Sequence, residues 1–425
     1  MPAKEFFLPV WRDGNRIDLL HNGIAYFPAL LDAIDRAERT VHLETYIFNL
    51  DRTGEAFMAG LIRARQRGVR VRVVIDGFGS SAHAEDIHRR LMEAGVACRV
   101  YRPEPSGIRN WRIDPRRLRR LHRKVAVIDQ REAYVGGINI LDDFEDVPDD
   151  GDGPRPRFDF AVRVRGPLVF DIVRSQDRLW LRMSWRKLWR GDKAVSAKGY
   201  RRKGWNETYA RVSEWWGKRG KHMLKSYPVY EPGCRAIFLL RDNLRFRQSI
   251  ETAYMRTLEH ARSDALIANA YFFPGRRLRQ VLAQAAARGV RVRLLLQGRS
   301  EYPMQYRACR YMYRKLLGRG IEIHEYMASY LHAKAAVIDN YATVGSSNLD
   351  PFSLLLAREA NVFTDDPEFA QELRAILEKE MASSARQVTL DDLQKRSWLG
   401  QLIDALSYMM LRVGVALTGR ASEYD

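Results

Sequence analysis

The sequence contains two closely similar segments, and this duplication constrains the fold more than any other feature. The segment LHRKVAVIDQREAYVGGIN begins at Leu121, and LHAKAAVIDNYATVGSSN begins at Leu331. A single short pattern of this kind recurs by chance, whereas two copies in one chain indicate a shared chemical purpose. Each copy carries a His, a Lys two residues later and an Asp five residues after the Lys: His122, Lys124, Asp129 and His332, Lys334, Asp339.

The repeat extends upstream of both motifs. LETYIF (43–48) and RGVRVRVVIDG (67–77) precede the first motif, and IANAYFF (267–273) and RGVRVRLLLQG (288–298) precede the second. Each copy reads as strand, helix, strand, loop, strand, with a Gly expected as the helix C-cap before each VRVR run. Strands that alternate with helices favour an α/β sandwich with a largely parallel or mixed sheet. The sequence therefore predicts two homologous α/β sandwich domains that face each other.

The spacing of these features also predicts the domain limits. The expected units are a first motif domain (1–170), a basic Trp-rich insert (171–232), a second motif domain (233–385) and an amphipathic tail (386–425). The N-terminus lacks the apolar run of a signal peptide, and no stretch approaches the roughly 20 apolar residues of a spanning helix. We therefore expect the protein on the cytoplasmic side.

Positive charge is concentrated between the two repeats. The chain has a formal net charge of +19, and residues 174–225 contain 16 Lys or Arg against four Asp or Glu, with six of the nine Trp. Trp favours a membrane interface and cations favour an anionic leaflet, so this segment suits a lipid surface. The same composition suits nucleic acid, or a solvated basic helix whose Trp side chains pack on the core.

The C-terminal tail gives a second indication of a membrane. Its apolar residues fall three and four positions apart, which is typical of one face of a helix. Asp404 and Arg412 interrupt the apolar run, so such a helix would lie on a bilayer or on the protein rather than cross a membrane. The stripe consists of Leu399, Leu402, Ile403, Leu406, Met410, Val413 and Leu417.

Two facing His-x-Lys pairs suit the cleavage of a phosphodiester. One His can attack phosphorus, and the other can protonate the leaving oxygen and later deprotonate the acceptor. The two Lys residues would hold negative charge on the phosphoryl oxygens, and Asn139 and Asn348, with the Gly137 and Ser346 turns, would bind the same oxygens. We expect neither a metal nor another cofactor in this chemistry.

A nucleophilic imidazole needs its second nitrogen held, normally by a carboxylate. Glu359 and Asp159 lie at similar distances downstream of the two His residues and are the candidates. Asp129 and Asp339, at the strand ends, belong to the motif and are included in the catalytic set, although their expected role is to fix a turn. An acidic, Gly- and Pro-rich stretch in the first repeat explains why its spacing is longer.

The duplicated HxKxxxxD motifs, each followed by GGxN or GSxN, resemble those of the phospholipase D superfamily. Segments such as LLDAIDRAERTVHLETYIF and VGSSNLDPFSLLL look most like bacterial cardiolipin synthases of the B type. The resemblance implies two domains related by a pseudo-twofold, with the active site at their interface. It also implies a phosphohistidine intermediate on His122, acid–base catalysis by His332, and acids that pair across the twofold, Glu359 with His122 and Asp159 with His332. Gly137 departs from the family, which commonly has Ser there.

On this resemblance, the expected activity is transfer of a phosphatidyl group to phosphatidylglycerol or glycerol, at the cytoplasmic face of the bacterial inner membrane as a peripheral protein. Expected partners are phosphatidylglycerol, phosphatidylethanolamine, cardiolipin and an anionic membrane surface, with nucleic acid disfavoured. A phospholipase D-type hydrolase and a nuclease stay open as alternatives, and an inactive lipid-binding scaffold is disfavoured because both motifs are intact. The sequence does not indicate the oligomeric state.

Overall fold

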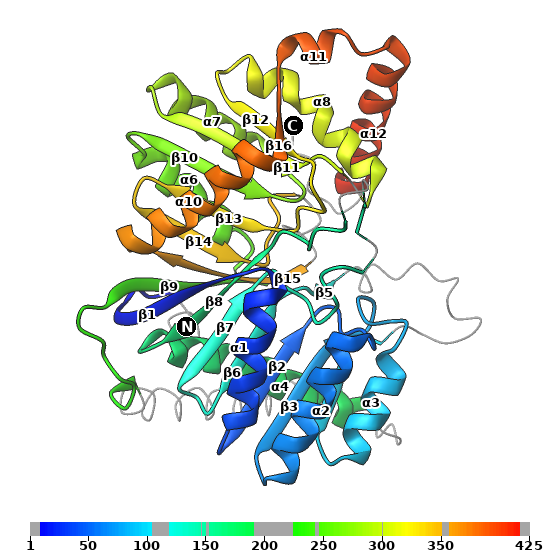
Figure 1. Cartoon of the computed structure of the whole chain (residues 1–425), viewed down its shortest axis with the longest axis vertical. Helices are drawn as coiled ribbons and strands as arrows, with labels where there is room; N and C mark the ends of the chain where they lie inside the picture. Colours follow the sequence, from blue (N-terminus) through cyan, green and yellow to red (C-terminus); the bar gives the residue numbers. More distant parts are fainter. Residues whose placement is uncertain are drawn as a thin grey trace, which may run out of the picture.

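A single mixed sheet runs through both halves of the protein (Figure 1). The computed structural model describes residues 9–103, 119–145, 147–149, 153–190, 224–242, 246–299, 301–350 and 357–416, with only the backbone of 184–190 and 415–416. Within these residues the sheet comprises 16 strands.

The first half supplies eight strands and four helices. Its strands are β1 (Arg12–His21), β2 (Thr40–Thr45), β3 (Arg70–Asp76), β4 (Ala97–Tyr101), β5 (Arg120–Leu121), β6 (Lys124–Ile128), β7 (Glu132–Gly136) and β8 (Phe160–Arg165). Its helices are α1 (Asn22–Arg36), α2 (Arg52–Gln66), α3 (Ala84–Glu93) and α4 (Leu168–Arg190).

The second half repeats this plan and adds elements at its end. Its strands are β9 (Cys234–Arg241), β10 (Asp264–Asn269), β11 (Arg291–Gln297), β12 (Glu322–Tyr326), β13 (Lys334–Ile338), β14 (Tyr341–Gly345), β15 (Ala357–Thr364) and β16 (Ala385–Val388). Its helices are α6 (Ser249–His260), α7 (Arg276–Ala287), α8 (Pro303–Leu317), α10 (Pro367–Ser384), α11 (Leu390–Gln394) and α12 (Trp398–Ala416).

Strand order shows the internal duplication directly. The first half has the order β4-β3-β2-β6-β7-β8-β1, and the second has β12-β11-β10-β13-β14-β15-β9. In both halves the first three of these strands are parallel to one another and the following strands are antiparallel. The halves join where β1 pairs antiparallel with β9. The two homologous α/β domains predicted from the sequence are confirmed.

The helix ends follow from local sequence. The side chain of Asp51 caps α2 by accepting a hydrogen bond of 2.8 Å from the amide of Gly54. The C-cap residues of α2 and α7 are Arg67 and Arg288, and the expected glycines follow them directly. Gly68 adopts a φ of +91° and Gly289 a φ of +90°. Only glycine adopts this left-handed conformation without strain, so it turns the chain from helix into strand.

The region between β3 and the first motif differs from the prediction. The sequence predicted a loop there, whereas the structure has α3 and β4, and the second half has α8 and β12 in the same places. Helix α3 has ten residues and buries only Ile87 and Leu91. Ile87 and Leu91 are four positions apart, which is helical spacing, so the sequence carried a short helical signal that the prediction of a loop did not use.

Helices cover both faces of the sheet, and the apolar core is continuous across the junction between the halves. Helices α1, α2 and α3 cover one face of the first half, and α6, α7 and α8 cover the corresponding part of the second. On the opposite face, α4 and α10 pack over one cluster that contains strand residues of both halves, including Val125 and Phe160 with Leu266 and Val337. This shared cluster fixes the two motif domains relative to each other.

The Trp-rich insert is only partly described. Trp180 on α4 is 8% exposed, and the guanidinium carbon of Arg99 lies 3.7 Å from its ring centroid. For this Trp the structure therefore supports core packing. The other five Trp side chains of the insert, and residues 191–223, lie outside the described part of the chain.

Candidate active site

The two motifs meet at the centre of the molecule because each is hydrogen-bonded to the opposite half. Strand β5 pairs in parallel with β15, and Leu331 forms a parallel bridge with Phe158. The amide of His122 donates to the carbonyl of Arg358 at 3.0 Å, and the amide of His332 donates to that of Phe158 at 2.9 Å. Each His lies two residues before the Lys that begins the motif strand, β6 or β13, where the chain crosses to the other half.

His122 is paired with Glu359, which β15 of the second half carries. The His122 Nδ1 atom lies 3.0 Å from Oε1 and 3.1 Å from Oε2 of Glu359, whose side chain is fully buried. The hydroxyl of Ser346 donates to the same Oε2 atom at 2.6 Å and accepts from the amide of Ala360 at 3.1 Å. The carboxylate is therefore oriented by two groups and holds the Nδ1–H tautomer of His122, leaving Nε2 free to react.

His332 is paired in the same way with Asp159, which precedes β8 of the first half. The distance from His332 Nδ1 to Asp159 Oδ2 is 2.6 Å, and Asp159 Oδ1 accepts from the amide of Phe160 at 2.8 Å. Gly137 occupies the position that Ser346 has in the other half. A Cβ atom on Gly137 would lie 2.3 Å from Oδ1 and 2.6 Å from Oδ2 of Asp159, so no side chain fits beside this carboxylate. Both acids pair across the pseudo-twofold, as the family resemblance implied.

Two lysines bring positive charge to the same centre. Lys124 and Lys334 are 2% and 1% exposed, and each Nζ atom donates to the backbone carbonyl of its own motif His, at 2.8 Å for Lys124. Burial lowers the pKa of Lys124 to about 7 and that of Lys334 to about 8, although Glu359 and Asp159 oppose the shift. An anion that entered the site would favour the charged form of both lysines.

The surroundings of both histidines lower their pKa and favour the neutral imidazole. Burial lowers the pKa of His122, against the effect of Glu359, and Lys124 lowers it further. The pKa of His332 is well below its usual value because of burial and because Lys334, Lys124 and His122 are close. Burial also raises the pKa of Asp159 to about 6, although Lys334 opposes this shift. A neutral His122 has the free electron pair that a nucleophile needs.

Of the turn residues expected to bind substrate, Gly137 and Ser346, through their amides, and Asn139, through its Oδ1 atom, are engaged within the protein. The amides of Gly137 and Ser346 donate to the carbonyls of Phe160 and Ala360, at 2.9 and 3.0 Å, so neither N–H is free for a phosphate. Asn139 Oδ1 accepts from the amide of Ile47 at 3.2 Å. Within the described residues, the buried Asn348 Oδ1 has no hydrogen-bond partner.

The motif acids require a correction, because the sequence included them in the catalytic set. The carboxylate of Asp129 accepts from the amides of Glu38, Arg39 and Thr40, at 2.7 to 2.9 Å. A five-residue strand of about 16 Å separates Asp129 from Lys124. A carboxylate at that end of the strand does not reach the histidines, and it satisfies backbone donors where β2 begins.

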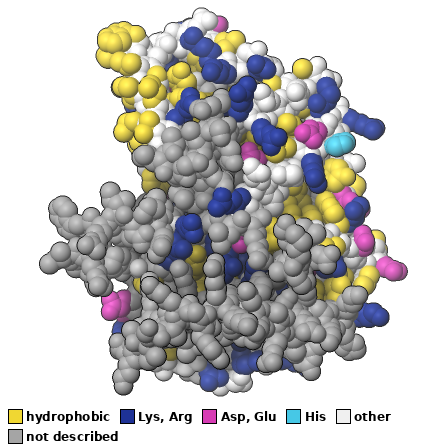
Figure 2. Space-filling model, turned by 180° about the vertical axis from the view of Figure 1, so that it is seen from behind, with side chains coloured by type: hydrophobic (Ala, Val, Ile, Leu, Met, Phe, Trp, Pro, Cys, Tyr) yellow, Lys and Arg dark blue, Asp and Glu magenta, His cyan; other side chains and the backbone are white. Residues whose placement is uncertain are grey.

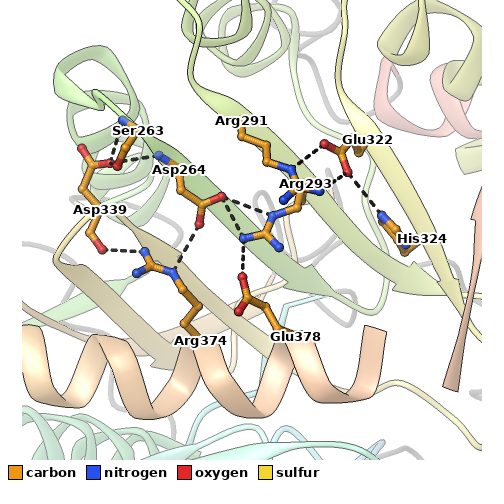
Figure 3. A network of polar contacts seen from close by, with 9 residues as sticks. All are labelled: Ser263, Asp264, Arg291, Arg293, Glu322, His324, Asp339, Arg374 and Glu378. Atoms are coloured by element: carbon orange, nitrogen blue, oxygen red, sulfur yellow. Dashed lines mark hydrogen bonds and ion pairs between the residues drawn. The ribbon is translucent and has the colours of Figure 1, made fainter. Parts of the chain in front are cut away.

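Asp339 has the same structural role in the second half, where it belongs to a polar network (Figure 3). It accepts from the amides of Arg262, Ser263 and Asp264 and from the Ser263 hydroxyl at 2.6 Å. Arg374 donates to the Asp339 carbonyl at 2.7 Å and forms an ion pair with Asp264. Asp339 therefore ties β13 to the start of β10.

Two further side chains lie at the site and were not predicted as functional. The ring of Tyr46, just after β2, is 4.6 Å from that of His122 between centroids, and Lys124 Nζ is 5.3 Å from the Tyr46 ring. Arg157 forms an ion pair with Glu301 at 3.1 Å and contributes to the lowered pKa of His332. The recurrence of Tyr after β2 and β10, at Tyr46 and Tyr271, was the signal available in the sequence.

A duplicated α/β fold with two histidine–carboxylate pairs exchanged across its internal twofold defines a class of two-motif phospholipase D-like proteins. The family model described as "Cardiolipin synthase, PLD-like domain" matches residues 30–143 and 254–381. Cardiolipin synthase B of Salmonella typhi is 37% identical, and that of Escherichia coli (strain K12) is 38% identical; each alignment covers 96% of this chain and 91% of the relative. The chain therefore belongs to the cardiolipin synthase family of phospholipase D-like proteins.

A solved structure agrees on the fold. The phosphatidylserine synthase of Haemophilus influenzae Rd KW20 superposes with a TM-score of 0.63 at 13% identity, over 95% of each chain. The family expected from the motifs is confirmed by the family model and the two relatives, and this structure adds agreement on the fold.

Proposed function

We propose that this protein is a phosphatidyltransferase that makes cardiolipin. One phospholipid donates its phosphatidyl group to the enzyme, and the hydroxyl of phosphatidylglycerol, or of glycerol, accepts it. The observation that carries the proposal is the pair of crossed dyads, His122 with Glu359 and His332 with Asp159, beside two buried lysines. The similarity to proteins named cardiolipin synthase B, over nearly the whole chain, supports the choice of substrates.

In the first step, Nε2 of His122 attacks the phosphorus of the donor lipid. A P–N bond forms, the bond from phosphorus to the headgroup oxygen breaks, and His332 gives its proton to that oxygen. Glu359 stabilises the positive imidazole that forms on His122, and Lys124 and Lys334 balance the charge on the phosphoryl oxygens. Asn139 and Asn348 are proposed to add neutral contacts to the same substrate, with the orphaned Oδ1 of Asn348 as an acceptor for a substrate hydroxyl.

His332 must be protonated for this step, although its surroundings favour the neutral imidazole. The anionic phosphodiester supplies the change, because its negative charge offsets the nearby cations that lower the pKa of His332. Binding of the correct substrate thus prepares the general acid. Asp159 holds the Nδ1–H of His332 and stabilises the charged form.

In the second step, the acceptor hydroxyl gives its proton to His332 and attacks the phosphohistidine. The new P–O bond replaces the P–N bond, which frees His122 for another cycle. Water in place of the lipid hydroxyl would give phosphatidic acid, so the balance between transfer and hydrolysis depends on which hydroxyl occupies the site.

The same proposal places the protein on the cytoplasmic face of the inner membrane as a peripheral enzyme. Its substrates are phospholipids, and the excess positive charge of the chain matches an anionic leaflet. Among the described residues, no helix is both long enough and apolar enough to cross a bilayer.

The test is a lipid product assay on the purified protein. Vesicles of phosphatidylglycerol, with and without phosphatidylethanolamine, are incubated with wild type, His122→Ala and His332→Ala, and the lipids are separated and quantified. Cardiolipin from wild type alone supports the proposal. Phosphatidic acid without cardiolipin would make the protein a hydrolase, and cleavage of DNA without lipid turnover would make it a nuclease.

A trapping experiment tests which histidine is the nucleophile. Phosphatidylglycerol labelled with ³²P in the phosphatidyl phosphate is mixed with the enzyme and quenched in alkali, which preserves phosphohistidine. The label is expected on the peptide that contains His122, and its recovery on the His332 peptide would reverse the assignment.

A further inference from the structure

Helix α12 exposes a broad apolar side to solvent, while the side that faces the protein carries Asp404 and Ser407 together with Tyr408 and the buried Leu411. Its buried residues include Asp404 and Ser407, which are 5% and 7% exposed. A surface helix normally has the opposite arrangement, so this face is not explained by packing within the chain. Eight apolar side chains on α12 are between 42% and 71% exposed: Trp398, Leu399, Leu402, Ile403, Leu406, Met409, Met410 and Val413.

Specific contacts fix this orientation. The carboxylate of Asp404 accepts a 2.6 Å hydrogen bond from Arg396 and lies 3.8 Å from Arg307 of α8. The ring of Tyr408 contacts those of Tyr311, at 4.5 Å between centroids, and Phe273, at 5.3 Å. If the helix turned to bury its apolar stripe, it would lose these ring contacts and break the buried ion pair of Asp404.

The neighbourhood of the stripe is basic. The positive charge lies on α8, which contains four Lys or Arg and no acid, although Arg307 pairs with Asp404 and Arg310 with Glu325. Helix α12 itself contains Arg412 and Asp404, and the preceding α11 contains Asp391 and Asp392. Figure 2 shows hydrophobic side chains gathered at the upper left, over the region of α12, with Lys and Arg side chains beside them. An apolar stripe with a basic rim matches an anionic lipid surface, which offers both an apolar layer and negative charge.

We propose that α12 is the membrane-docking element, lying in the plane of an anionic bilayer with its exposed stripe among the lipids. This inference rests on the proposed function, because it concerns how the enzyme reaches a lipid substrate. Trp398 at the N-terminal end suits the level of the headgroups, and Leu402, Leu406 and Met410 along the helix suit the boundary of the acyl chains.

Helix α8 lies between the exposed apolar stripe of α12 and the active site. Tyr302, at the start of α8, is 56% exposed and its ring lies 5.9 Å from that of Tyr271. Tyr271 follows β10 as Tyr46 follows β2, and Tyr46 contacts His122. Helix α8 therefore leads from the neighbourhood of the catalytic residues to the surface that α12 occupies.

The decisive experiment measures binding to vesicles. Wild type and the triple variant Leu402→Ser, Leu406→Ser, Met410→Ser are mixed with phosphatidylglycerol vesicles and, separately, with phosphatidylcholine vesicles, then floated on a density gradient. We expect the triple variant to partition onto phosphatidylglycerol at least tenfold less than wild type. A matched control, Val10→Ser, Ile24→Ser, Tyr341→Ser, removes three exposed apolar side chains elsewhere and should bind as wild type does.

Activity in two lipid environments separates this inference from the proposed function. In detergent micelles, where no bilayer must be found, the triple variant should make cardiolipin within twofold of wild type, and in vesicles its rate should fall with its binding. If wild type makes no cardiolipin in either environment, the proposed function fails. If wild type is active and the triple variant binds and works on vesicles equally well, only the docking role of α12 fails.

A second readout reports the contact itself. An environment-sensitive fluorophore on Met410→Cys is expected to shift to shorter wavelength with phosphatidylglycerol vesicles, and the same fluorophore on Ile24→Cys should not. Sedimentation tests the alternative that a second copy of the protein covers the α12 face. The proposal is overturned if wild type forms a dimer, the triple variant does not, and both bind vesicles equally well.

Discussion

Replacing Gly137 by Ala tests whether the Asp159–His332 pair limits the rate. The added Cβ would lie 2.3 and 2.6 Å from the two carboxylate oxygens of Asp159, about 1 Å closer than ordinary contact. Asp159 is buried, and its oxygens bind His332 at 2.6 Å and the Phe160 amide at 2.8 Å. Moving the carboxylate by that amount breaks at least one charge-assisted hydrogen bond, which costs about 1.5–3 kcal/mol. We therefore expect kcat/KM to fall by roughly 10- to 150-fold.

The assay is the initial rate of cardiolipin formation in micelles, with a thermal melt to confirm folding. The control is Gly60→Ala on α2, where the added Cβ meets its nearest neighbour at 3.5 Å, so activity should be unchanged. A pH profile of kcat tests the cause, because kcat reports the complex with substrate, in which the mechanism requires a protonated His332. A misplaced Asp159 stabilises that charged form less, so the alkaline limb of the kcat profile should move to lower pH. Wild-type kinetics in a folded Gly137→Ala protein would refute the reasoning.

Three further predictions follow from the same contacts. Ser346→Ala removes the 2.6 Å donor to Glu359 and the acceptor of the Ala360 amide, so kcat should fall about 10- to 100-fold and stability by about 1–3 kcal/mol. An unchanged kcat would show that His122 alone orients this carboxylate. A plot of kcat/KM against pH should be bell-shaped. The value falls on the alkaline side as Lys124 and Lys334 lose protons, with pKa values of about 7 and 8, and on the acid side as His122, whose pKa is lowered, gains a proton. Activity that rose steadily to pH 10 would contradict the role of charged lysines. Asp339→Ala leaves three amides and a hydroxyl without their acceptor, so chemical denaturation should show a free energy of unfolding about 1–3 kcal/mol lower. The control Asp32→Ala removes an exposed ion pair on α1 and should lower the free energy of unfolding by less than about 1 kcal/mol.

Much of the catalytic centre could be predicted because duplication makes short motifs informative. The repeated His and Lys identified side chains that the structure brings together, and the family resemblance supplied the exchange of Glu359 and Asp159 between halves. Sequence spacing alone did not reveal that exchange, because it depends on β5 and Leu331 pairing with the opposite half. The fit of Gly137 against Asp159 is likewise a three-dimensional contact, so its departure from the family pattern had no explanation before the structure.

Other features were ambiguous for identifiable physical reasons. Asp129 and Asp339 belong to the motif by sequence, yet a strand separates them from the chemistry, and only their hydrogen bonds reveal this. The periodicity of the tail predicted the apolar stripe correctly from Leu399 to Val413, whereas Leu417 lies outside the described residues. Periodicity does not say whether a stripe faces inward or outward. That direction is decided by Asp404 and Tyr408, which bind α8 from the polar side.

The exchange of carboxylates between the halves also bears on how such a chain can evolve. If the two motif domains were separate identical subunits, every substitution would appear on both sides of the axis, and the two histidines would have equal surroundings. Covalent fusion removes that restriction: Glu359 is accompanied by Ser346, whereas Asp159 faces Gly137. One histidine can then be selected for attack and the other for proton transfer, which is the asymmetric division of labour that the proposed mechanism requires of a symmetric fold.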